Sequence, residues 1–115
     1  MIRFNDWTFD RKTMTVTHGD RSHAFVDRPD ALVRRFRINR RYATMEHIVL
    51  SGERATRDSL WELLYSDHED GGPIGGTKIF DVMFSQMRPA LKTLGVRLVQ
   101  DKRAGVRYLS LRHVV

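Results

Sequence analysis

Two side chains near the middle of a predicted helix could recognise the edges of nucleic-acid bases. Gln86 carries a carboxamide that can pair with adenine through two hydrogen bonds, and Arg88 carries a guanidinium that can pair with guanine in the same way. Val82 could contact a thymine methyl group, and Lys78 and Ser85 on the same face could contact a base or a phosphate. The alternative interpretation is an ordinary solvated helix face. The opposite face carries the apolar residues Phe80, Phe84 and Met87.

Two further groups of residues carry chemistry that suits phosphate. Lys102 and Arg103, followed by Arg107, form a short basic segment that suits a narrow minor groove or a pair of phosphates. Thr56 and Arg57 begin a predicted helix, and the free N–H groups of a helix N-terminus bind phosphate. The alternatives are a charged hairpin tip that keeps a sheet edge soluble and a plain helix cap followed by a surface arginine.

Charge is distributed unevenly along the 115 residues, whose formal net charge is +6. Residues 1–30 are neutral overall, residues 31–60 carry +4, residues 61–75 carry −4 and residues 76–115 carry +6. A basic domain with a separate acidic segment is typical of a protein with a polyanionic partner and a patch that such a partner repels. The alternative is a soluble basic protein with scattered charge. The densest basic cluster can face solvent, a protein or flanking DNA backbone; it comprises Arg34, Arg35, Arg37, Arg40 and Arg41.

The other polar residues give little support to catalysis or to metal binding. The chain has no cysteine, which excludes disulfides and thiolate zinc fingers. Its five histidines share no helical face, and no Ser–His–Asp set or carboxylate pair can be argued from spacing. The Asp-His-Glu-Asp stretch at residues 67–70 lacks the spacing of a calcium loop, and no Walker lysine follows the glycines of residues 71–76. We therefore expect no enzymatic activity, no cofactor and no metal.

The elements that must position these residues begin with short strands. Phe4, Trp7 and Phe9 are apolar within a strand-forming segment at residues 2–10, and the β-branched alternation of residues 13–18 predicts another strand. Gly19 and Asp20 predict a turn, residues 23–26 a return strand, and residues 32–38 a further, irregular one; such a small sheet must pack against other elements to be stable.

Two helices follow, each with a recognisable start. Asn39 is a good N-cap for a helix that runs to about Leu50, and Thr56 is a good N-cap for a second helix over residues 57–65. Residues 66–77 predict a loop, because acids are followed there by four glycines and a proline.

The rest of the chain predicts a third helix and a hairpin. The helix begins at Thr77 or Lys78 and runs to about Leu94, where Gly95 ends it. Residues 96–100 and 106–111 predict two strands, joined by a basic tip at residues 101–105. Helices followed by a basic hairpin are typical of a winged helix-turn-helix, in which the third helix enters a major groove and the hairpin is the wing.

Several segments resemble one family of such domains, the OmpR/PhoB type, which are the DNA-binding output modules of bacterial response regulators. Residues 78–91 resemble its recognition helix, with residues of the same type at Asp81, Val82, Ser85, Arg88 and Leu91. Residues 52–60 resemble its turn and second helix, residues 105–108 (Gly-Val-Arg-Tyr) resemble its wing, and the early strands resemble the sheet that precedes its helices. The resemblance covers nearly the whole chain.

The sequence also departs from that family at several positions. Pro89 lies inside the third helix in place of a lysine, so we expect a kink or a re-aimed helix. Gln86 replaces an arginine that contacts DNA in the family, and Arg107 replaces the second glycine of the wing. Met1 leads almost directly into the first strand, so we expect a stand-alone domain without a receiver, which receiver phosphorylation does not control, unless the chain is an excised fragment.

The resemblance also implies a role for the acidic segment. In the family, the loop between the second and third helices contacts RNA polymerase, which makes Asp67, Glu69 and Asp70 a candidate protein-contact loop. The alternative is a solvated connector.

These observations predict one α+β domain over residues 1–115: a winged helix-turn-helix with an N-terminal antiparallel sheet (1–38), three helices (39–94) and a C-terminal β-hairpin wing (95–115). The expected function is that of a bacterial or phage transcriptional regulator, cytoplasmic and nucleoid-associated, that binds double-stranded DNA sequence-specifically. RNA polymerase and a second copy of the chain on DNA are further candidate partners. A membrane is not a candidate partner, because the longest apolar runs, such as Ile48–Leu50, are far too short to span one. The alternatives are a protein-interaction module that binds RNA polymerase or another regulator, and a nucleic-acid-processing accessory factor.

Overall fold

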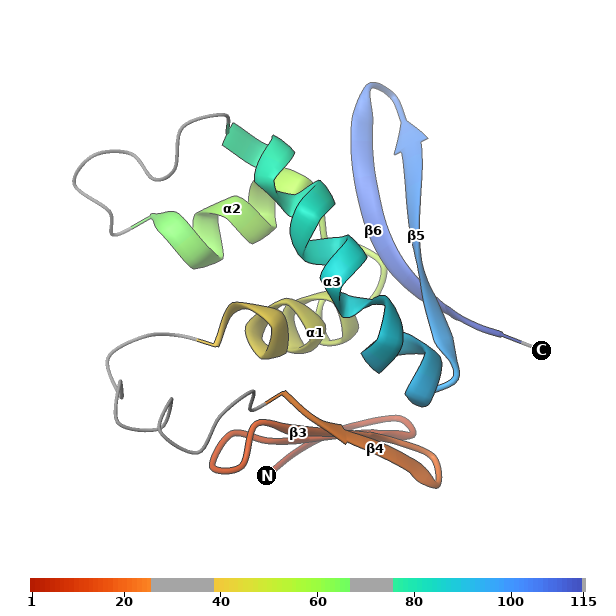
Figure 1. Cartoon of the computed structure of the whole chain (residues 1–115). Coiled ribbons are helices and arrows are strands. Elements are labelled where there is room, and N and C mark those ends of the chain that lie inside the picture. Colours follow the sequence, from red (N-terminus) through yellow and green to blue (C-terminus); the bar gives the residue numbers. More distant parts are fainter. Residues whose placement is uncertain (26–38, 67–75, 115) are drawn as a thin grey trace.

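Four short strands form an antiparallel meander at the start of the chain. In the computed structural model, which describes residues 1–25, 39–66 and 76–114, their order in the sheet is β1-β2-β3-β4 (Figure 1). Phe9 and Val16 are paired across two of these strands and are fully buried, so they mark the inner face of the sheet. The bounds are β1 (Ile2–Phe4), β2 (Trp7–Asp10), β3 (Thr15–His18) and β4 (Arg21–Ala24).

The turns of the meander differ in detail from those that the sequence predicts. Asn5 adopts a φ of 53° and divides residues 2–10 into two strands instead of one segment. Met14, also at a φ of 53°, belongs to the next turn, so β3 begins at Thr15 and not at residue 13. The tight turn at Gly19 pairs His18 with Arg21, and β4 therefore occupies residues 21–24 instead of 23–26. The strand predicted at residues 32–38 lies outside the described residues.

The first two α-helices begin and end where the sequence predicts. Asn39 precedes α1 (Arg40–Leu50); its side chain accepts a hydrogen bond from Tyr42 N at 3.0 Å and donates one to Phe25 O, which ties the helix start to the end of the sheet. Thr56 precedes α2 (Arg57–Tyr65), where the hydroxyls of Thr56 and Ser59 each bind the other's backbone N–H in a capping box.

The third helix consists of a 3₁₀ turn, η2 (Gly76–Lys78), followed by α3 (Ile79–Thr93). α3 is assigned as one uninterrupted helix through Pro89, so the proline does not break it. Pro89 has no N–H to donate to Ser85 O one turn earlier, and the side chains of both residues are exposed.

The chain ends in a hairpin that is longer than the sequence predicts. Its strands are β5 (Val96–Arg103) and β6 (Val106–His113), paired in register from Val96↔His113 to Arg103↔Val106. The turn is therefore only Ala104 and Gly105, both at positive φ, as a two-residue hairpin of the I′ kind requires. The basic residues expected in a loop at 101–103 are strand residues instead.

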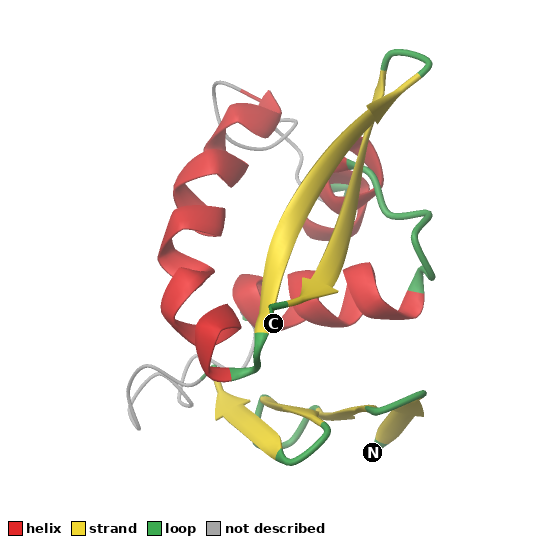
Figure 2. Ribbon diagram, turned by 90° about the vertical axis from the view of Figure 1, so that its right-hand side faces the viewer, coloured by secondary structure: helices red, strands yellow, loops and turns green. Residues whose placement is uncertain are grey.

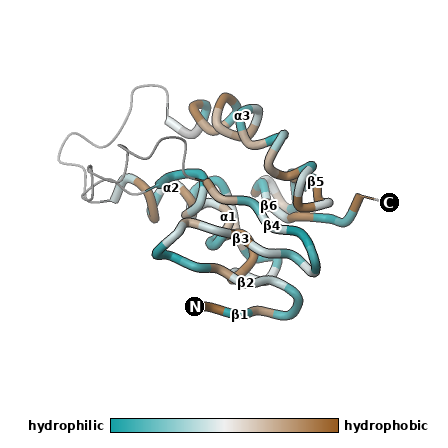
Figure 3. The backbone as a smooth tube through the Cα atoms, turned by 60° about the horizontal axis from the view of Figure 1, so that its bottom comes forward, coloured by the Kyte–Doolittle hydropathy of each residue, from teal (hydrophilic) through white to brown (hydrophobic). Residues whose placement is uncertain are grey.

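The elements pack around one apolar core. The sheet lies below α1 in Figure 1, and the hairpin stands beside α3 (Figures 1 and 2). Polar and apolar stretches follow one another along α3, as the hydropathy colours in Figure 3 show. Apolar residues that recur once per helical turn place one side of the helix against the core. The central side chains come from every layer: Phe9, Met45, Leu60, Phe80, Leu94 and Leu109 are all fully buried. The described residues thus form an α+β structure with three α-helices.

An ion pair attaches the sheet to α1. Arg11, in the turn between β2 and β3, donates from Nε to both carboxylate oxygens of Glu46 at 3.2 Å. Burial of Glu46 opposes its ionisation, but the interactions with Arg11 and the neighbouring Tyr42 outweigh that effect and lower the pKa of Glu46 below its ordinary value.

Candidate nucleic-acid interface

The exposed face of α3 carries the side chains that the sequence singles out. Val82, Ser85, Gln86 and Arg88 are all exposed, and Lys78 is exposed just before the helix begins. The side chains on the other face are buried: Phe80, Phe84, Met87 and Leu91. Val82 is 62% exposed, which leaves its methyl groups available to a ligand. The predicted division of this helix into a core face and a polar face is confirmed.

Arg57 does not lie on the exposed basic surface where the sequence places it. It is only 8% exposed, its Nε donates to Gln100 Oε1 at 2.9 Å, and its guanidinium forms an ion pair with Asp81. Its guanidinium carbon also lies 5.8 Å from the centre of the Phe84 ring. Because Asp81 belongs to α3 and Gln100 to β5, Arg57 of α2 braces the helix against the hairpin.

Thr56 is likewise used inside the protein. Its hydroxyl and its backbone N–H both take part in the capping box with Ser59, and it forms an isolated β-bridge with Tyr108 of the hairpin. The Thr56–Arg57 pair is therefore a structural junction of α2, α3 and the hairpin. The side chains of both residues are thus engaged within the chain. The phosphate contact expected at this helix N-terminus, which depends on backbone N–H groups, stays a prediction from sequence.

The same junction fixes the hairpin to the helices. Leu109 N donates to Ala55 O at 2.8 Å, next to the bridge between Thr56 and Tyr108. Val96 and Leu109 point inward and are buried, and they share one hairpin face with Leu98 and Leu111. This apolar face holds the base of the hairpin on the core, while its tip extends beyond it (Figure 1).

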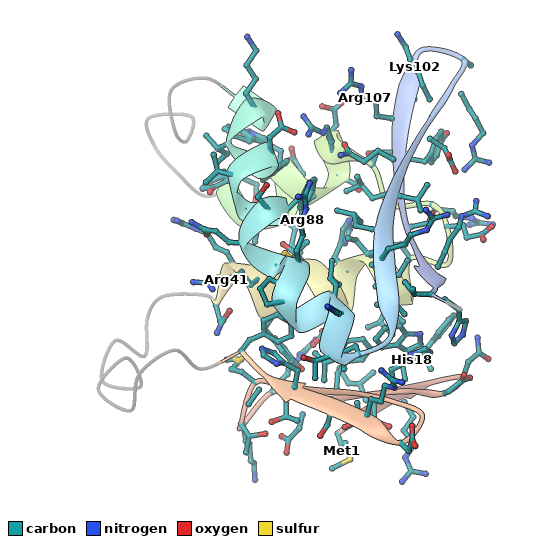
Figure 4. The ribbon with its side chains drawn as sticks, turned by 45° about the vertical axis from the view of Figure 1, so that its right-hand side comes forward. Met1, His18, Arg41, Arg88, Lys102 and Arg107 are labelled. Atoms are coloured by element: carbon teal, nitrogen blue, oxygen red, sulfur yellow. The ribbon has the colours of Figure 1, made fainter. Side chains whose placement is uncertain are left out.

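Two cations lie directly opposite each other near the tip. Lys102 pairs with Arg107 in the strand register, and both side chains are exposed. Like charges at such positions destabilise a hairpin, so these residues are not explained by strand pairing. Arg103 is also exposed, and its guanidinium carbon lies 4.3 Å from the centre of the Tyr108 ring. Figure 4 shows Lys102 and Arg107 near the tip and Arg88 on the helix beside it.

The acids of this region are already paired within the chain. Residues 76–114 hold eight Lys and Arg but only two acids, Asp81 and Asp101. Asp81 is paired with Arg57, and Asp101 is paired with Arg112 at 3.3 Å. The remaining positive charge of α3 and the hairpin therefore has no further acid within residues 76–114 to pair with, although Glu53 lines a cavity together with Lys102 and Arg103. The excess of positive charge favours an anionic ligand.

A groove of ≈ 760 Å³ lies between α3, from Asp81 to Lys92, and β5. Its basic lining residues include three that the sequence does not single out, namely Arg21, Lys92 and Arg97, together with Arg88. Lys92 could have been found from its spacing, because it lies one helical turn after Arg88. Arg21 comes from the sheet, and only its packing over Gly95 brings it there; a Cβ on that glycine would lie 3.4 Å from Arg21 Cδ.

Part of the predicted site lies outside the described residues. This applies to the candidate protein-contact loop at Asp67, Glu69 and Asp70, and to Arg34, Arg35 and Arg37 of the basic cluster. Contact with RNA polymerase therefore stays a prediction from sequence. Of the remaining two arginines, Arg40 is exposed at the start of α1, 5.1 Å from the centre of the Tyr65 ring, and Arg41 is half-buried.

Comparison with known proteins identifies no relative of the chain. No protein family matches the chain, and neither the curated proteins nor the solved structures include a significant match to it. None of the helices in the described part of the chain is long and apolar enough to span a membrane.

Proposed function

We propose that the chain is a sequence-specific transcriptional regulator that binds double-stranded DNA as a winged helix. In this proposal α3 enters the major groove, and the tip of the β5–β6 hairpin contacts the minor groove or the phosphate backbone. The observation that carries the proposal is the exposed positive surface that α3 shares with the hairpin, where the two acids of residues 76–114, Asp81 and Asp101, are already paired with arginines.

The exposed face of α3 offers three kinds of base contact. The carboxamide of Gln86 suits adenine, the guanidinium of Arg88 suits guanine, and the methyl groups of Val82 suit the thymine C5-methyl group. Each bidentate pair discriminates against the wrong base by about 1–3 kcal/mol. Sequence preference would therefore come from α3.

Affinity would come mainly from phosphate contacts. The exposed lysine and arginine side chains available for phosphate contacts are Lys78, Arg88, Lys92, Lys102, Arg103 and Arg107. Arg57 contributes indirectly, because its bonds to Asp81 and Gln100 hold α3 and β5 in one fixed relation. A rigid relation between helix and hairpin lets both bind one duplex without a further loss of conformational entropy.

Salt dependence tests this proposal directly. If about six phosphates are neutralised, the logarithm of the association constant should fall with the logarithm of salt concentration at a slope near −5. Gel shifts with genomic DNA fragments would first identify a preferred duplex, and fluorescence anisotropy would then give the slope. An affinity that does not change with salt contradicts the proposal.

A pair of charge-matched variants separates local contact from net charge. Arg107→Thr removes a cation at the hairpin tip, whereas Lys12→Thr removes one from the exposed turn between β2 and β3. The first should weaken binding to all duplexes and make the salt slope shallower by about 1, and the second should leave the slope unchanged. Equal effects of the two substitutions on DNA affinity and salt slope would mean that the hairpin does not contact DNA. A folded protein that binds no DNA would favour the alternative, a winged helix that binds a regulator protein.

A further inference from the structure

A second cluster of polar side chains lies at the other end of the hairpin from its tip. Asp6 is in the turn between β1 and β2, His18 is the last residue of β3, and His113 is the last residue of β6. One ligand atom from each of the three lies within 4.8 Å of the others. The sequence predicts no metal site, and the spacing of these residues along the chain gives no signal of one.

We propose that Asp6, His18 and His113 bind a divalent transition-metal ion, and that Zn²⁺ is the ion that this set fits best. Two imidazoles and one carboxylate form a set typical of zinc sites that leave a fourth position for water or another ligand. The two nitrogen ligands disfavour Mg²⁺ and Ca²⁺, which prefer oxygen.

His18 is held as a metal-binding histidine usually is. It is only 7% exposed, and its Nδ1 lies 3.1 Å from Leu94 O. A carbonyl oxygen only accepts, so the Nδ1 position carries the hydrogen and the neutral ring has its lone pair on Nε2. A backbone carbonyl that fixes the tautomer in this way commonly supports a histidine ligand from behind.

The free nitrogen of His18 faces the other two residues. Its Nε2 lies 3.8 Å from Asp6 Oδ2, too far for a hydrogen bond. The His113 ring is 4.6 Å from the His18 ring, centre to centre, and the indole of Trp7 stacks on His18 at 4.0 Å. His18 is therefore a buried, oriented ring that lies beside two exposed side chains able to act as ligands, Asp6 and His113.

An ion could reach these atoms from outside. The three residues line one open cavity of ≈ 250 Å³ together with Asn5 and Glu53, and Figure 4 shows His18 at the base of the hairpin. Binding would draw these ligand atoms closer together than the 4.8 Å within which they lie now, by rotation of the exposed side chains of Asp6 and His113. The bound ion would join the sheet to the C-terminal end of the hairpin and would stabilise the folded chain by mass action.

The test uses the full chain without an affinity tag, stripped of metal by a chelator. Calorimetric titration with Zn²⁺ should give one ion per chain, and Zn²⁺ should raise the melting temperature. His113→Ala and Asp6→Asn each remove one exposed ligand, so both variants should fold and should bind Zn²⁺ more than about tenfold more weakly. His23→Gln, at a histidine of β4 outside the cavity, is the matched control and should bind as the parent does.

A second measurement reports on geometry. Co²⁺ should give visible absorption bands of a four-coordinate site, and it should quench the fluorescence of Trp7, which lies against His18. Both signals should be lost in His113→Ala. Absence of Zn²⁺ binding by the parent, or undiminished binding in both ligand variants, would overturn the proposal, and neither result depends on whether the chain binds DNA.

Discussion

The N-terminal sheet and the C-terminal hairpin use the same antiparallel pairing but place very different residues opposite each other. In the sheet, Phe9 faces Val16, and both are fully buried. At the hairpin tip, Lys102 faces Arg107, and both are exposed. The first pairing stabilises the fold, and the second destabilises it slightly. The difference indicates that the tip carries residues suited to an external anion, whereas the sheet carries residues suited to the core.

The substitution expected to have the largest effect on this contrast is Phe9→Ala. Removing a fully buried phenylalanine should lower the free energy of unfolding by about 3–5 kcal/mol, as measured by urea denaturation. DNA affinity of the folded fraction should change little, because Phe9 is fully buried in β2 and forms no part of the exposed face of α3. Phe9→Leu is the milder control. A variant that keeps full stability but loses DNA binding would mean that the sheet itself forms part of the interface.

The next test concerns the division of labour on the helix. Gln86→Ala and Arg88→Ala should each cost about 1–3 kcal/mol of binding at the preferred duplex and relax sequence preference there. Anisotropy titrations with the preferred duplex and single-base variants would measure this loss. Stability should be nearly unchanged, because both side chains are exposed. If both variants keep the parent's preference, α3 does not read the bases in the proposed register.

A substitution at the hairpin tip should have effects opposite to those of Phe9→Ala: stability should rise and DNA affinity should fall. Arg107→Thr removes the repulsion with Lys102 and introduces a β-branched residue, so the free energy of unfolding should rise by about 0.2–1 kcal/mol. The same variant should bind DNA more weakly. Lys102→Thr should raise the free energy of unfolding less in the Arg107→Thr background than in the parent, because the repulsion is already gone there. Urea denaturation of the four proteins gives this cycle, and a loss of stability in Arg107→Thr would contradict the comparison.

The smallest test concerns the ion pair that attaches the sheet. The pKa of Glu46 is lowered, so its ionisation stabilises the fold above the ordinary glutamate pKa, and that contribution is lost as pH falls through the lower folded-state value. Glu46→Gln should therefore be less stable than the parent at neutral pH, by no more than about 1 kcal/mol. The difference should shrink as pH is lowered below about 4. A difference that persists in acid would assign the effect to packing instead.

Local signals predict most of the fold. Asn39 and Thr56 have the side chains of helix caps, and α1 and α2 begin directly after them. The strand ends are predicted less well, since Met14 and Ala104 adopt positive φ although neither is glycine. Such a conformation costs about 1–2 kcal/mol, which interactions elsewhere in the folded structure must offset. A sequence pattern contains no sign of it.

The candidate site divides in the same way. Helical periodicity predicts which side of α3 is exposed, because one apolar face must be buried in any such helix. The role of Arg57 could not be predicted, because its partner Gln100 comes from a distant strand. The grouping of Asp6, His18 and His113 escapes sequence reasoning for the same reason: three elements from both ends of the chain meet there.

The hydrogen bond from Leu109 N to Ala55 O has a consequence for the order in which the molecule assembles. The meander and the hairpin each pair neighbouring residues, so each can form within microseconds of collapse. Docking the hairpin beside Ala55 requires closure of a much longer loop, whose entropy opposes it. We therefore expect docking to be a late event in folding. Weakening that contact should accelerate unfolding more than it slows folding, so the junction that orients the hairpin would also set the lifetime of the native state.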